Sequence, residues 1–291
     1  MKIAVFSREI DEAYVPKVEL LLNSLSEKGA ELFYYEDFCK KAEKSITIPH
    51  SGVFTSYEDI PKETALFLAL GGDGTFLSAL TFIRESNIPV AGINFGRLGF
   101  LTTVKVSDDI GWVDDIINSH FSIEKRSLIK LESPCLMPDI YPYALNDITL
   151  QRRSNSMLGI KLIIDGFSAP VYWADGLLVS TPTGSTAYSL AVGGPIVTPA
   201  SEVLIIAPIA PHNLNIRPLV VPDSSTIELS LISRDEEALL TIDNQTIILP
   251  ANEEVVIKKG DFSLNYLSLG GNTFMGALNE KLSWGEDGRN R

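Results

Sequence analysis

The stretch from residue 65 to residue 75 reads Ala-Leu-Phe-Leu-Ala-Leu-Gly-Gly-Asp-Gly-Thr, an apolar run that ends in three glycines around one aspartate. Such a run is typical of a strand buried on both faces of a sheet, and residues 76–83 after it have the pattern of a helix. Glycine has no Cβ, so the turn can adopt positive φ angles and approach a ligand closely. The first turn of the helix offers unpaired N–H groups and the positive end of its dipole to a phosphate. The stretch therefore predicts a strand, a phosphate-binding turn and a helix.

Asp73 needs its own explanation, because a carboxylate in this turn repels phosphate. It would be explained if Asp73 accepts a proton from an attacking hydroxyl or shares a magnesium ion with a polyphosphate. The alternative is structural: a tight strand-to-helix turn in which the aspartate forms part of the helix cap. The turn is not the dinucleotide fingerprint Gly-x-Gly-x-x-Gly, since Leu77 occupies the position of the last glycine.

The residues around this stretch repeat the alternation of strand and helix. Short apolar runs predict strands at 3–6, 32–35 and 89–93, and apolar residues at helical spacing predict a helix at 15–25 that ends near Gly29. Strands that are apolar on both faces and alternate with helices indicate a parallel sheet covered by helices. The first hundred residues therefore predict a Rossmann-like α/β domain.

From about residue 125 onward, apolar and polar residues alternate, at 225–232, 239–249 and 254–258. Turn residues punctuate this half: Asp165-Gly166, Asp243-Asn244 and Lys259-Gly260-Asp261. This is the pattern of antiparallel strands with one buried face. We predict an α/β domain at 1–102, a β-rich antiparallel domain at 103–270, and a C-terminal segment at 271–291 with a frayed tail, for which a return to the first domain is one arrangement.

Composition excludes several classes of partner. The net charge is −13 and the pI is about 4.7, whereas binding to duplex nucleic acid or to a membrane surface needs a local excess of Lys and Arg. We therefore expect neither partner, and we expect phosphates to be held by backbone N–H groups, a metal ion or a few placed cations. Cys39 and Cys135 imply no disulfide framework, and the chain shows neither a signal peptide nor a membrane span. These features predict a cytoplasmic protein.

A second glycine-rich segment, 92–101, overlaps the end of the predicted strand at 89–93 and reads Gly-Ile-Asn-Phe-Gly-Arg-Leu-Gly-Phe-Leu. Glycine-rich turns at neighbouring strand ends are what a crevice at the carboxyl edge of an open sheet requires. Arg97 is either a cation for a polyphosphate or a solvated surface residue. Phe100 either stacks on a base or belongs to the core.

A third unusual segment runs from Asp175 to Tyr188 and reads Asp-Gly-Leu-Leu-Val-Ser-Thr-Pro-Thr-Gly-Ser-Thr-Ala-Tyr, with Gly193-Gly194-Pro195 shortly downstream. A strand at 177–179 leads into a loop with five hydroxyl residues around Pro182 and Gly184. Short donors and acceptors with exposed backbone can bind a ribose, an amide or a phosphate. On chemistry alone, a β-turn rich in Ser and Thr is an equal alternative.

Together these segments resemble the signature blocks of the NAD kinase family. The blocks are Gly71-Gly72-Asp73-Gly74-Thr75, then Asn146-Asp147, then the segment from Asp175 through Tyr188 to Gly194, and, as a fourth, the segment 210–218. They follow the family's order across residues 65–250. The first block alone is shared with diacylglycerol and sphingosine kinases and, more remotely, with phosphofructokinases, whereas the segment 175–194 is far more specific.

The resemblance implies phosphoryl transfer from ATP, or another phosphoryl donor, to the 2′-hydroxyl of the adenosine ribose of NAD, with Mg²⁺ as cofactor. It also implies a homodimer or homotetramer. Asp73 would be the general base, and the triphosphate would be bound by Gly71, Gly72, Gly74, Thr75 and Arg97. NAD would be bound by Asp73, Gly74, Asn146, Asp147, Asp175, Thr186, Ala187, Tyr188, Ser189, Leu190, Ala191 and Gln245, with Phe100 and Thr183 lining the pocket. Asp175 would contact the nicotinamide end.

Two departures from the family pattern are mild. The family mostly has Asn-Glu where this chain has Asn146-Asp147, and Asp-Gly-Gln where this chain has Asp243-Asn244-Gln245. The shorter acid keeps its charge, and Asn tolerates the left-handed conformation. Two other functions compete with NAD phosphorylation: a lipid kinase, which would be expected to carry a basic or apolar membrane-facing patch, and a non-catalytic NADP-binding protein, which would not need Asp73.

Overall fold

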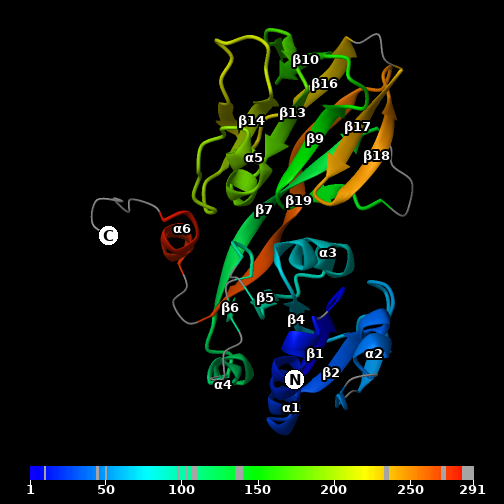
Figure 1. Ribbon diagram of the computed structural model, residues 1–291, viewed down its shortest axis with the longest axis vertical. Coiled ribbons are helices and arrows are strands. Elements are labelled where there is room, and N and C mark those ends of the chain that lie inside the picture. Colours follow the sequence, from blue (N-terminus) through cyan, green and yellow to red (C-terminus); the bar gives the residue numbers. More distant parts are fainter. Residues whose placement is uncertain are drawn as a thin grey trace. The chain divides into compact units, whose positions relative to one another are not determined.

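The computed structural model describes residues 1–9, 11–43, 46–49, 51–96, 99–102, 104–105, 110–134, 140–232, 236–269 and 273–283 (Figure 1). The chain divides into two compact units, the first made of residues 1–125 and 264–291 and the second of residues 126–263. We expected the boundaries after residues 102 and 270. Residues 112–117 belong to the first unit because they form helix α4 (Trp112–Ile117), whose Val113 and Ile116 are fully buried in that unit's core.

The first unit is built on a parallel sheet with the order β5-β4-β1-β2-β3. Its strands are β1 (Lys2–Phe6), β2 (Glu31–Tyr35), β3 (Gly52–Phe54), β4 (Thr64–Leu70), β5 (Val90–Asn94) and β6 (Val104–Lys105). Its helices are α1 (Val15–Glu27), α2 (Glu36–Ala42), α3 (Asp73–Ile83), α4 and α6 (Phe274–Leu282), with a 3₁₀ helix at Glu12–Tyr14. Strand β5 also pairs with β6 and with the end of β19 (Val255–Ser268). Residues 264–268 of β19 belong to the first unit, and its earlier residues belong to the second.

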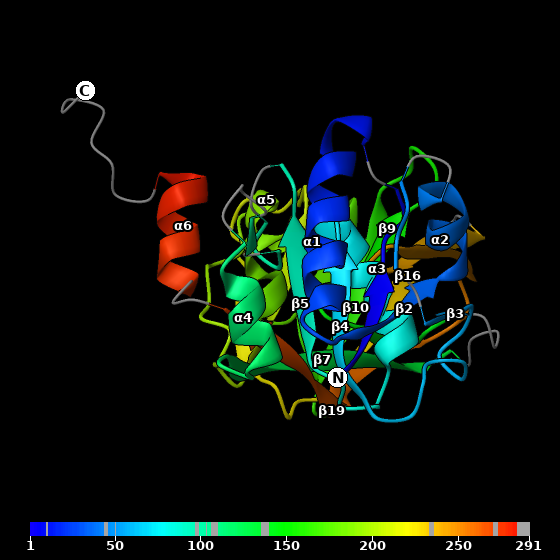
Figure 2. The ribbon, with the colours of Figure 1, turned by 90° about the horizontal axis from the view of Figure 1, so that it is seen from below.

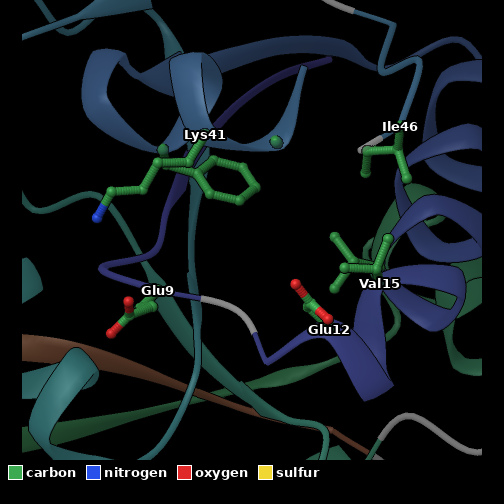
Figure 3. A pocket seen from close by; sticks show the side chains of 8 residues that line it. Glu9, Glu12, Val15, Lys41 and Ile46 are labelled. Atoms are coloured by element: carbon green, nitrogen blue, oxygen red, sulfur yellow. The ribbon is translucent and has the colours of Figure 1, made fainter. Parts of the chain in front are cut away.

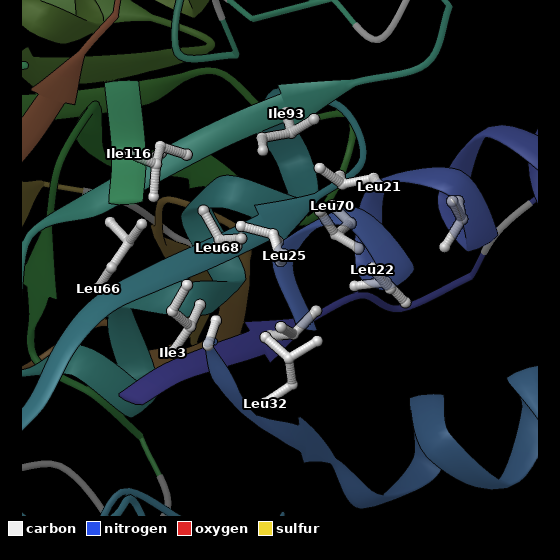
Figure 4. Close-up of a cluster of buried hydrophobic side chains, with 14 of the residues drawn as sticks. Ile3, Leu21, Leu22, Leu25, Leu32, Leu66, Leu68, Leu70, Ile93 and Ile116 are labelled. Atoms are coloured by element: carbon white, nitrogen blue, oxygen red, sulfur yellow. The ribbon is translucent and has the colours of Figure 1, made fainter. Parts of the chain in front are cut away.

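Both faces of this sheet are covered, as an apolar strand such as β4 requires. On one face, Leu21, Leu22 and Leu25 of α1 pack in one cluster with Ile3 of β1 and Leu68 of β4 (Figure 4). On the other face, Phe82 of α3 joins an aromatic cluster with Phe6, Phe54 and Phe67, at ring-centroid distances of 5.0 to 6.3 Å. Figure 2 shows α1 in front of these strands and α3 behind them.

The second unit consists of two sheets whose strand pairs are antiparallel where their register is defined. One sheet has the order β15-β14-β13-β9-β17-β18. The other contains β11-β10-β16-β19, with β12 paired to β10, β7 paired to β19 and β8 paired to β7. The strands are β7 (Ser122–Ser133), β8 (Tyr143–Ala144), β9 (Asp147–Arg152), β10 (Leu158–Ile164), β11 (Phe167–Ser168), β12 (Tyr172–Ala174), β13 (Gly176–Ser180), β14 (Val203–Ile209), β15 (Leu219–Pro222), β16 (Ile227–Ile232), β17 (Glu237–Ile242) and β18 (Gln245–Pro250).

The alternating residues of this unit build its core. Leu150 and Val179 of the six-stranded sheet and Ile160 and Leu229 of the other sheet belong to one buried cluster. The central strand β13 is buried along its whole length, because Leu178 joins a second cluster on the opposite face of its sheet. This explains why residues 177–179 are uniformly apolar in a half of the chain that otherwise alternates.

Several elements differ from the sequence-based expectations. Helix α3 begins at Asp73 and not at residue 76, and β3 was not predicted. The segment 181–188 is not an open loop but contains a 3₁₀ helix, η2 (Thr183–Thr186), and the start of a short helix, α5 (Tyr188–Ala191). The predicted turns at 165–166 and 243–244 are confirmed as the hairpin connections β10–β11 and β17–β18. Within the described part of the chain, no helix is long and apolar enough to cross a membrane.

The predicted turn at Lys259-Gly260-Asp261 is wrong, because these residues lie inside β19. Long-range partners hold them extended. Lys259 pairs with Asp223 at 2.5 Å, and Asp261 accepts hydrogen bonds from Lys130 at 3.0 Å and from the Tyr143 hydroxyl at 2.8 Å.

Candidate functional site

In the first unit, the glycine turn connects β4 to α3. Gly71 has a φ of 149°, and a Cβ at this position would lie 2.5 Å from the Thr75 hydroxyl oxygen, so the position requires glycine. Gly72 caps the helix in an extended conformation, and a Cβ at Gly72 or Gly74 would meet open space. The turn therefore exposes its backbone beside the N-terminus of an 11-residue helix, as a phosphate site needs.

Asp73 is the first residue of α3, but its carboxylate does not cap this helix. Both oxygens accept hydrogen bonds from the segment that follows β5. Oδ1 accepts from the backbone N–H of Leu101 and of Thr102, both at 3.1 Å, and from the Thr102 hydroxyl at 2.9 Å. Among the described residues, Oδ2 accepts one hydrogen bond, from the N–H of Phe100 at 2.8 Å. The two predicted glycine-rich segments thus meet at this carboxylate.

The residues around the Asp73 carboxylate are closely packed and hydrogen-bonded to one another. Thr102 is fully buried, and its hydroxyl also receives the Asn94 amide at 3.3 Å and the Gly99 N–H at 3.1 Å. A Cβ on Gly99 would lie 1.6 Å from Asp73 Oδ1, so only glycine allows the segment to approach the carboxylate. Asp73 remains partly exposed. The site therefore presents a fixed carboxylate, with Oδ2 as its less occupied oxygen.

In this segment, Phe100 was predicted to line the pocket and Arg97 to bind the triphosphate. The ring of Phe100 is partly buried, and the ammonium group of Lys281 in α6 lies 4.8 Å from its centroid. Phe100 is thus paired with a cation and does not belong to the core. Arg97 lies outside the described residues.

The first unit also contains a cavity of about 220 Å³ between α1 and α2 (Figure 3). Its apolar walls include Val15, Val18 and Phe38, and the carboxylates of Glu9 and Glu12 lie at its edge with Lys41. None of the site residues predicted from the sequence lines this cavity. Two carboxylates with one ammonium also oppose a polyphosphate, so we do not assign the cavity to the predicted site.

In the second unit, Asn146 and Asp147 stand at the start of β9. The Asp147 side chain is buried and accepts a hydrogen bond from the Thr149 hydroxyl at 3.0 Å. Burial raises the pKa of Asp147 to about 6, and the bond from Thr149 opposes this rise. Asn146 is partly exposed. The pair therefore consists of an amide group, on Asn146, and a carboxyl group with a raised pKa, on Asp147.

Asp243 is the residue that sequence reasoning missed. Its Oδ2 accepts from the N–H of Leu145 at 2.8 Å, and its Oδ1 accepts from the N–H of Asn146 at 2.9 Å and of Asp147 at 3.1 Å. Burial of the carboxyl group, together with the nearby Asp147, raises its pKa to about 7, while these backbone bonds oppose the rise. The signal in the sequence was an aspartate two positions before Gln245, to which we assigned a turn and no role at the site.

Gln245 does not present its amide to a ligand in this structure. Its Oε1 accepts from the N–H of Tyr141 and its Nε2 donates to the carbonyl of Tyr141, each at 3.1 Å. Both ends of the side chain are therefore used to hold residue 141.

The hydroxyl-rich segment (residues 175–194) contacts Leu145 and Asn146 directly. The carbonyl of Asn146 accepts from the Thr181 N–H at 2.9 Å and from the Ser180 hydroxyl at 3.1 Å. The Thr181 hydroxyl donates to the carbonyl of Leu145 at 2.5 Å and accepts from the N–H of Gly184 at 3.1 Å. The second and third signature blocks are thus brought together by hydrogen bonds.

Two hydroxyl groups of this segment are buried without a hydrogen-bond partner among the described residues, those of Thr183 and Ser189. Ser185, by contrast, exchanges hydrogen bonds with both backbone groups of Val197. A buried hydroxyl without a partner is costly, so Thr183 and Ser189 are suited to a polar ligand. Thr186, Ala187 and Leu190 are partly buried, and Ala191 is exposed.

The far end of β9 reaches the remaining predicted residues. Gln151 donates to the hydroxyl of the exposed Tyr188 at 2.9 Å, and Arg152 pairs with Asp175 at 3.1 Å. Strand β9 therefore carries Asp147 at one end and the partners of Tyr188 and Asp175 at the other. The Asp175 carboxylate is already paired, whereas we had expected it to contact a ligand.

Comparison with known proteins identifies the family of this chain. Residues 26–121 match the ATP-NAD kinase N-terminal domain and residues 145–269 match the ATP-NAD kinase C-terminal domain. The chain is 41% identical to the NAD kinase of Cytophaga hutchinsonii and 39% identical to that of Flavobacterium psychrophilum, with 100% of each chain covered.

Two solved structures are similar. One is a yeast NADH kinase complexed with NADH, with a TM-score of 0.86, 25% identity and coverage of 98% of this chain and 88% of that one. The other is an NAD kinase from Archaeoglobus fulgidus in complex with ATP, with a TM-score of 0.69, 26% identity and coverage of 92% and 94%. Both family domains and full-length relatives match, so this chain belongs to the NAD kinase family.

Proposed function

We propose that this chain transfers the γ-phosphoryl group of ATP to the 2′-hydroxyl of the adenosine ribose of NAD, giving NADP and ADP. The observation that carries the proposal is the Asp73 carboxylate, which is fixed by four hydrogen bonds yet partly exposed at the N-terminus of α3. Three of these bonds occupy Oδ1, whereas Oδ2 receives one. Oδ2 is therefore the atom of Asp73 that accepts the proton of the 2′-hydroxyl.

The chemical step is a single in-line displacement. As the 2′-oxygen forms its bond to the γ-phosphorus, the bond from that phosphorus to the bridging oxygen breaks and ADP leaves. The proton of the hydroxyl passes to Asp73 Oδ2. A positioned base of this kind contributes ~10²- to 10⁴-fold to the rate, and the remainder comes from holding the reactants in line.

The triphosphate enters as its magnesium complex. Among the described residues, no group of three His, Cys, Asp or Glu side chains is placed to hold a metal ion. In this proposal the triphosphate supplies most of the ligands of Mg²⁺. The exposed backbone at Gly72 and Gly74 and the helix N-terminus of α3 would bind the phosphates. Thr75, in the first turn of α3, adds the side chain that packs against Gly71.

The acceptor would be bound by residues of the second unit. Asn146 and Asp147 would bind the ribose and adenine portion, and the hydroxyl groups of Thr183 and Ser189 are suited to polar atoms of the same ligand because they are buried and lack partners among the described residues. Thr186, Ala187, Tyr188, Leu190 and Ala191 would line this pocket. Asp175 would meet the nicotinamide end as an ion pair with Arg152 and not as an isolated charge.

The test is a turnover assay of the purified chain with MgATP and NAD, and in parallel with NADH and with inorganic polyphosphate. NADP would be detected with an NADP-specific dehydrogenase, and the phosphate would be located on the 2′-oxygen by ³¹P NMR. We expect NADP from NAD with MgATP. If no NADP forms under any of these conditions, the proposed function is wrong. Sedimentation would test the expected homodimer or homotetramer, and fractionation of cells the expected cytoplasmic location.

A further inference from the structure

One carboxylate, that of Asp243, binds the N–H groups of three consecutive residues, Leu145, Asn146 and Asp147, at 2.8 to 3.1 Å. Three successive amides that point at one anion form a rigid concave backbone turn. The Asp243 N–H in return donates to the carbonyl of Asp147 at 3.0 Å. The hairpin turn at 243–244 and the start of β9 are therefore locked together by four hydrogen bonds.

The carbonyl groups of the same segment are also bound, from the hydroxyl-rich segment. The carbonyl of Leu145 accepts from Thr181, and that of Asn146 accepts from Ser180 and Thr181. With donors and acceptors both held, the main chain of 145–147 has one conformation. The directions in which the Asn146 and Asp147 side chains leave the backbone are fixed by it.

A hairpin turn alone does not require such a carboxylate. Asp165 stands at the equivalent place in the two-residue turn between β10 and β11, with a φ of 51° against 50° for Asp243. Its side chain accepts one backbone N–H, that of Thr226, at 2.8 Å. The contacts that Asp243 makes beyond this are directed at Asn146 and Asp147, which are proposed to bind NAD, and at the adjacent Leu145.

We infer that Asp243 is a positioning residue of the NAD site, whose carboxyl group sets the backbone of 145–147 and thereby the placement of Asn146 and Asp147 on the acceptor. This inference rests on the proposed function, because Asp243 would not contact the substrate and would act through the predicted NAD residues.

The test compares Asp243→Asn with Asp165→Asn in the full-length chain. Asparagine tolerates the positive φ, keeps one acceptor oxygen and places an NH₂ group against the remaining N–H donors. We expect the KM for NAD to rise about tenfold in Asp243→Asn, with the KM for ATP within about twofold, because one charged acceptor of three amides is lost. The Asp165→Asn control should match the wild type in both constants. An unchanged KM for NAD in Asp243→Asn overturns the inference.

A double-mutant cycle separates positioning from a general structural effect. If Asp243 acts through Asp147, then adding Asp243→Asn to Asp147→Ala should change the KM for NAD by less than about threefold. An equal effect in both backgrounds would show that Asp243 does not act through Asp147 and would overturn the inference. If Asp147→Ala itself leaves the KM unchanged, the proposed NAD site is wrong and the inference falls with it, which distinguishes the two failures.

A measurement on the unaltered protein covers the case in which Asp243→Asn does not fold. Amide hydrogen exchange followed by NMR should show Leu145, Asn146 and Asp147 protected, although Leu145 and Asn146 precede β9. Exchange of these three amides at the rate of an unstructured chain would overturn the inference without any variant.

Discussion

The Asp73 carboxylate shows how two oxygens of one residue come to have different tasks. Among the described residues, two backbone N–H groups and the Thr102 hydroxyl donate to Oδ1, whereas one N–H group donates to Oδ2. Because both oxygens accept from backbone amides, an asparagine at this position would place its NH₂ group against an N–H in either orientation. A second variant must therefore separate loss of the base from displacement of the segment 100–102.

Thr102 provides that variant and a first prediction. Thr102→Val keeps the shape of the buried side chain and removes the hydroxyl, which donates to Asp73 and accepts from Asn94 and Gly99. The kcat should therefore fall roughly tenfold while the KM for NAD stays within about twofold. Thr102→Ser, which retains the donor, should recover most of the rate. Steady-state kinetics of the two variants checks this, and a wild-type kcat in Thr102→Val would show that the hydroxyl does not position Asp73.

A second prediction at this scale concerns Asp147. Asp147→Ala should raise the KM for NAD by roughly 10- to 150-fold, the equivalent of ~1.5–3 kcal/mol for a hydrogen bond to a charged group. The KM for ATP should not follow it. If the KM for NAD stays at the wild-type value, Asn146-Asp147 is a structural turn and does not bind the acceptor.

At the scale of elements, the hairpin β17–β18 and strand β9 bring two acidic groups together away from water. Burial raises the pKa of Asp147 to about 6 and that of Asp243 to about 7, so the folded state binds protons more tightly than the unfolded state. For a raised acidic pKa, stability is present at low pH and is lost as the pH rises from the unfolded value near ~4 through the folded one.

This linkage predicts that Asp147→Asn flattens the pH dependence. Between about pH 5 and pH 8 the wild type should lose ~1–2 kcal/mol more of its free energy of unfolding than the variant does, since the variant cannot ionise at this position. Urea unfolding at the two pH values measures the difference, with Asp165→Asn as the matched turn control. Equal slopes in wild type and Asp147→Asn would mean that Asp147 titrates normally in the folded protein.

The elements also show what the sequence was able to predict. Strands β1, β2, β4 and β5 and helix α1 were found because their own apolar residues form the core, such as Leu21 and Leu68. Strand β3 was missed because only Phe54 among its three residues is buried. The turn predicted at 259–261 was wrong because Asp223, Lys130 and Tyr143, far away in sequence, hold these residues extended.

The site was predicted in part, for the same reason. Motifs identified Asp73, Asn146 and the hydroxyl-rich segment, but no local pattern connects Asp73 to Thr102 or Asp243 to residue 146. Gln245 is a predicted NAD residue, and its hydrogen bonds to the backbone of Tyr141, 104 residues away, could not be predicted from the sequence. A sequence motif identifies which residue types lie near one another along the chain. The hydrogen-bond partners of Asp73, Asp243 and Gln245 are distant in sequence and are determined by the tertiary fold.

At the scale of the whole molecule, a net charge of −13 opposes two anionic substrates. Added salt screens this repulsion over a Debye length of ~10 Å at about 0.1 M. We therefore predict that the KM for NAD either stays constant or falls by up to about twofold as NaCl is raised from about 20 to about 200 mM at constant free Mg²⁺. Initial-rate kinetics would show it. A KM that rises severalfold would indicate attraction by a basic surface that the composition does not suggest.

The central claim is that the Asp73 carboxylate accepts the proton of the ribose hydroxyl, and one measurement tests it directly. The kcat for NADP formation from NAD and MgATP is compared in wild type, Asp73→Asn and Thr102→Val, with NAD binding followed by calorimetry. We expect kcat to fall at least ~10²-fold in Asp73→Asn, with its Kd for NAD within about threefold of the wild type, and to fall roughly tenfold in Thr102→Val. A kcat in Asp73→Asn within about threefold of the wild type would contradict the claim.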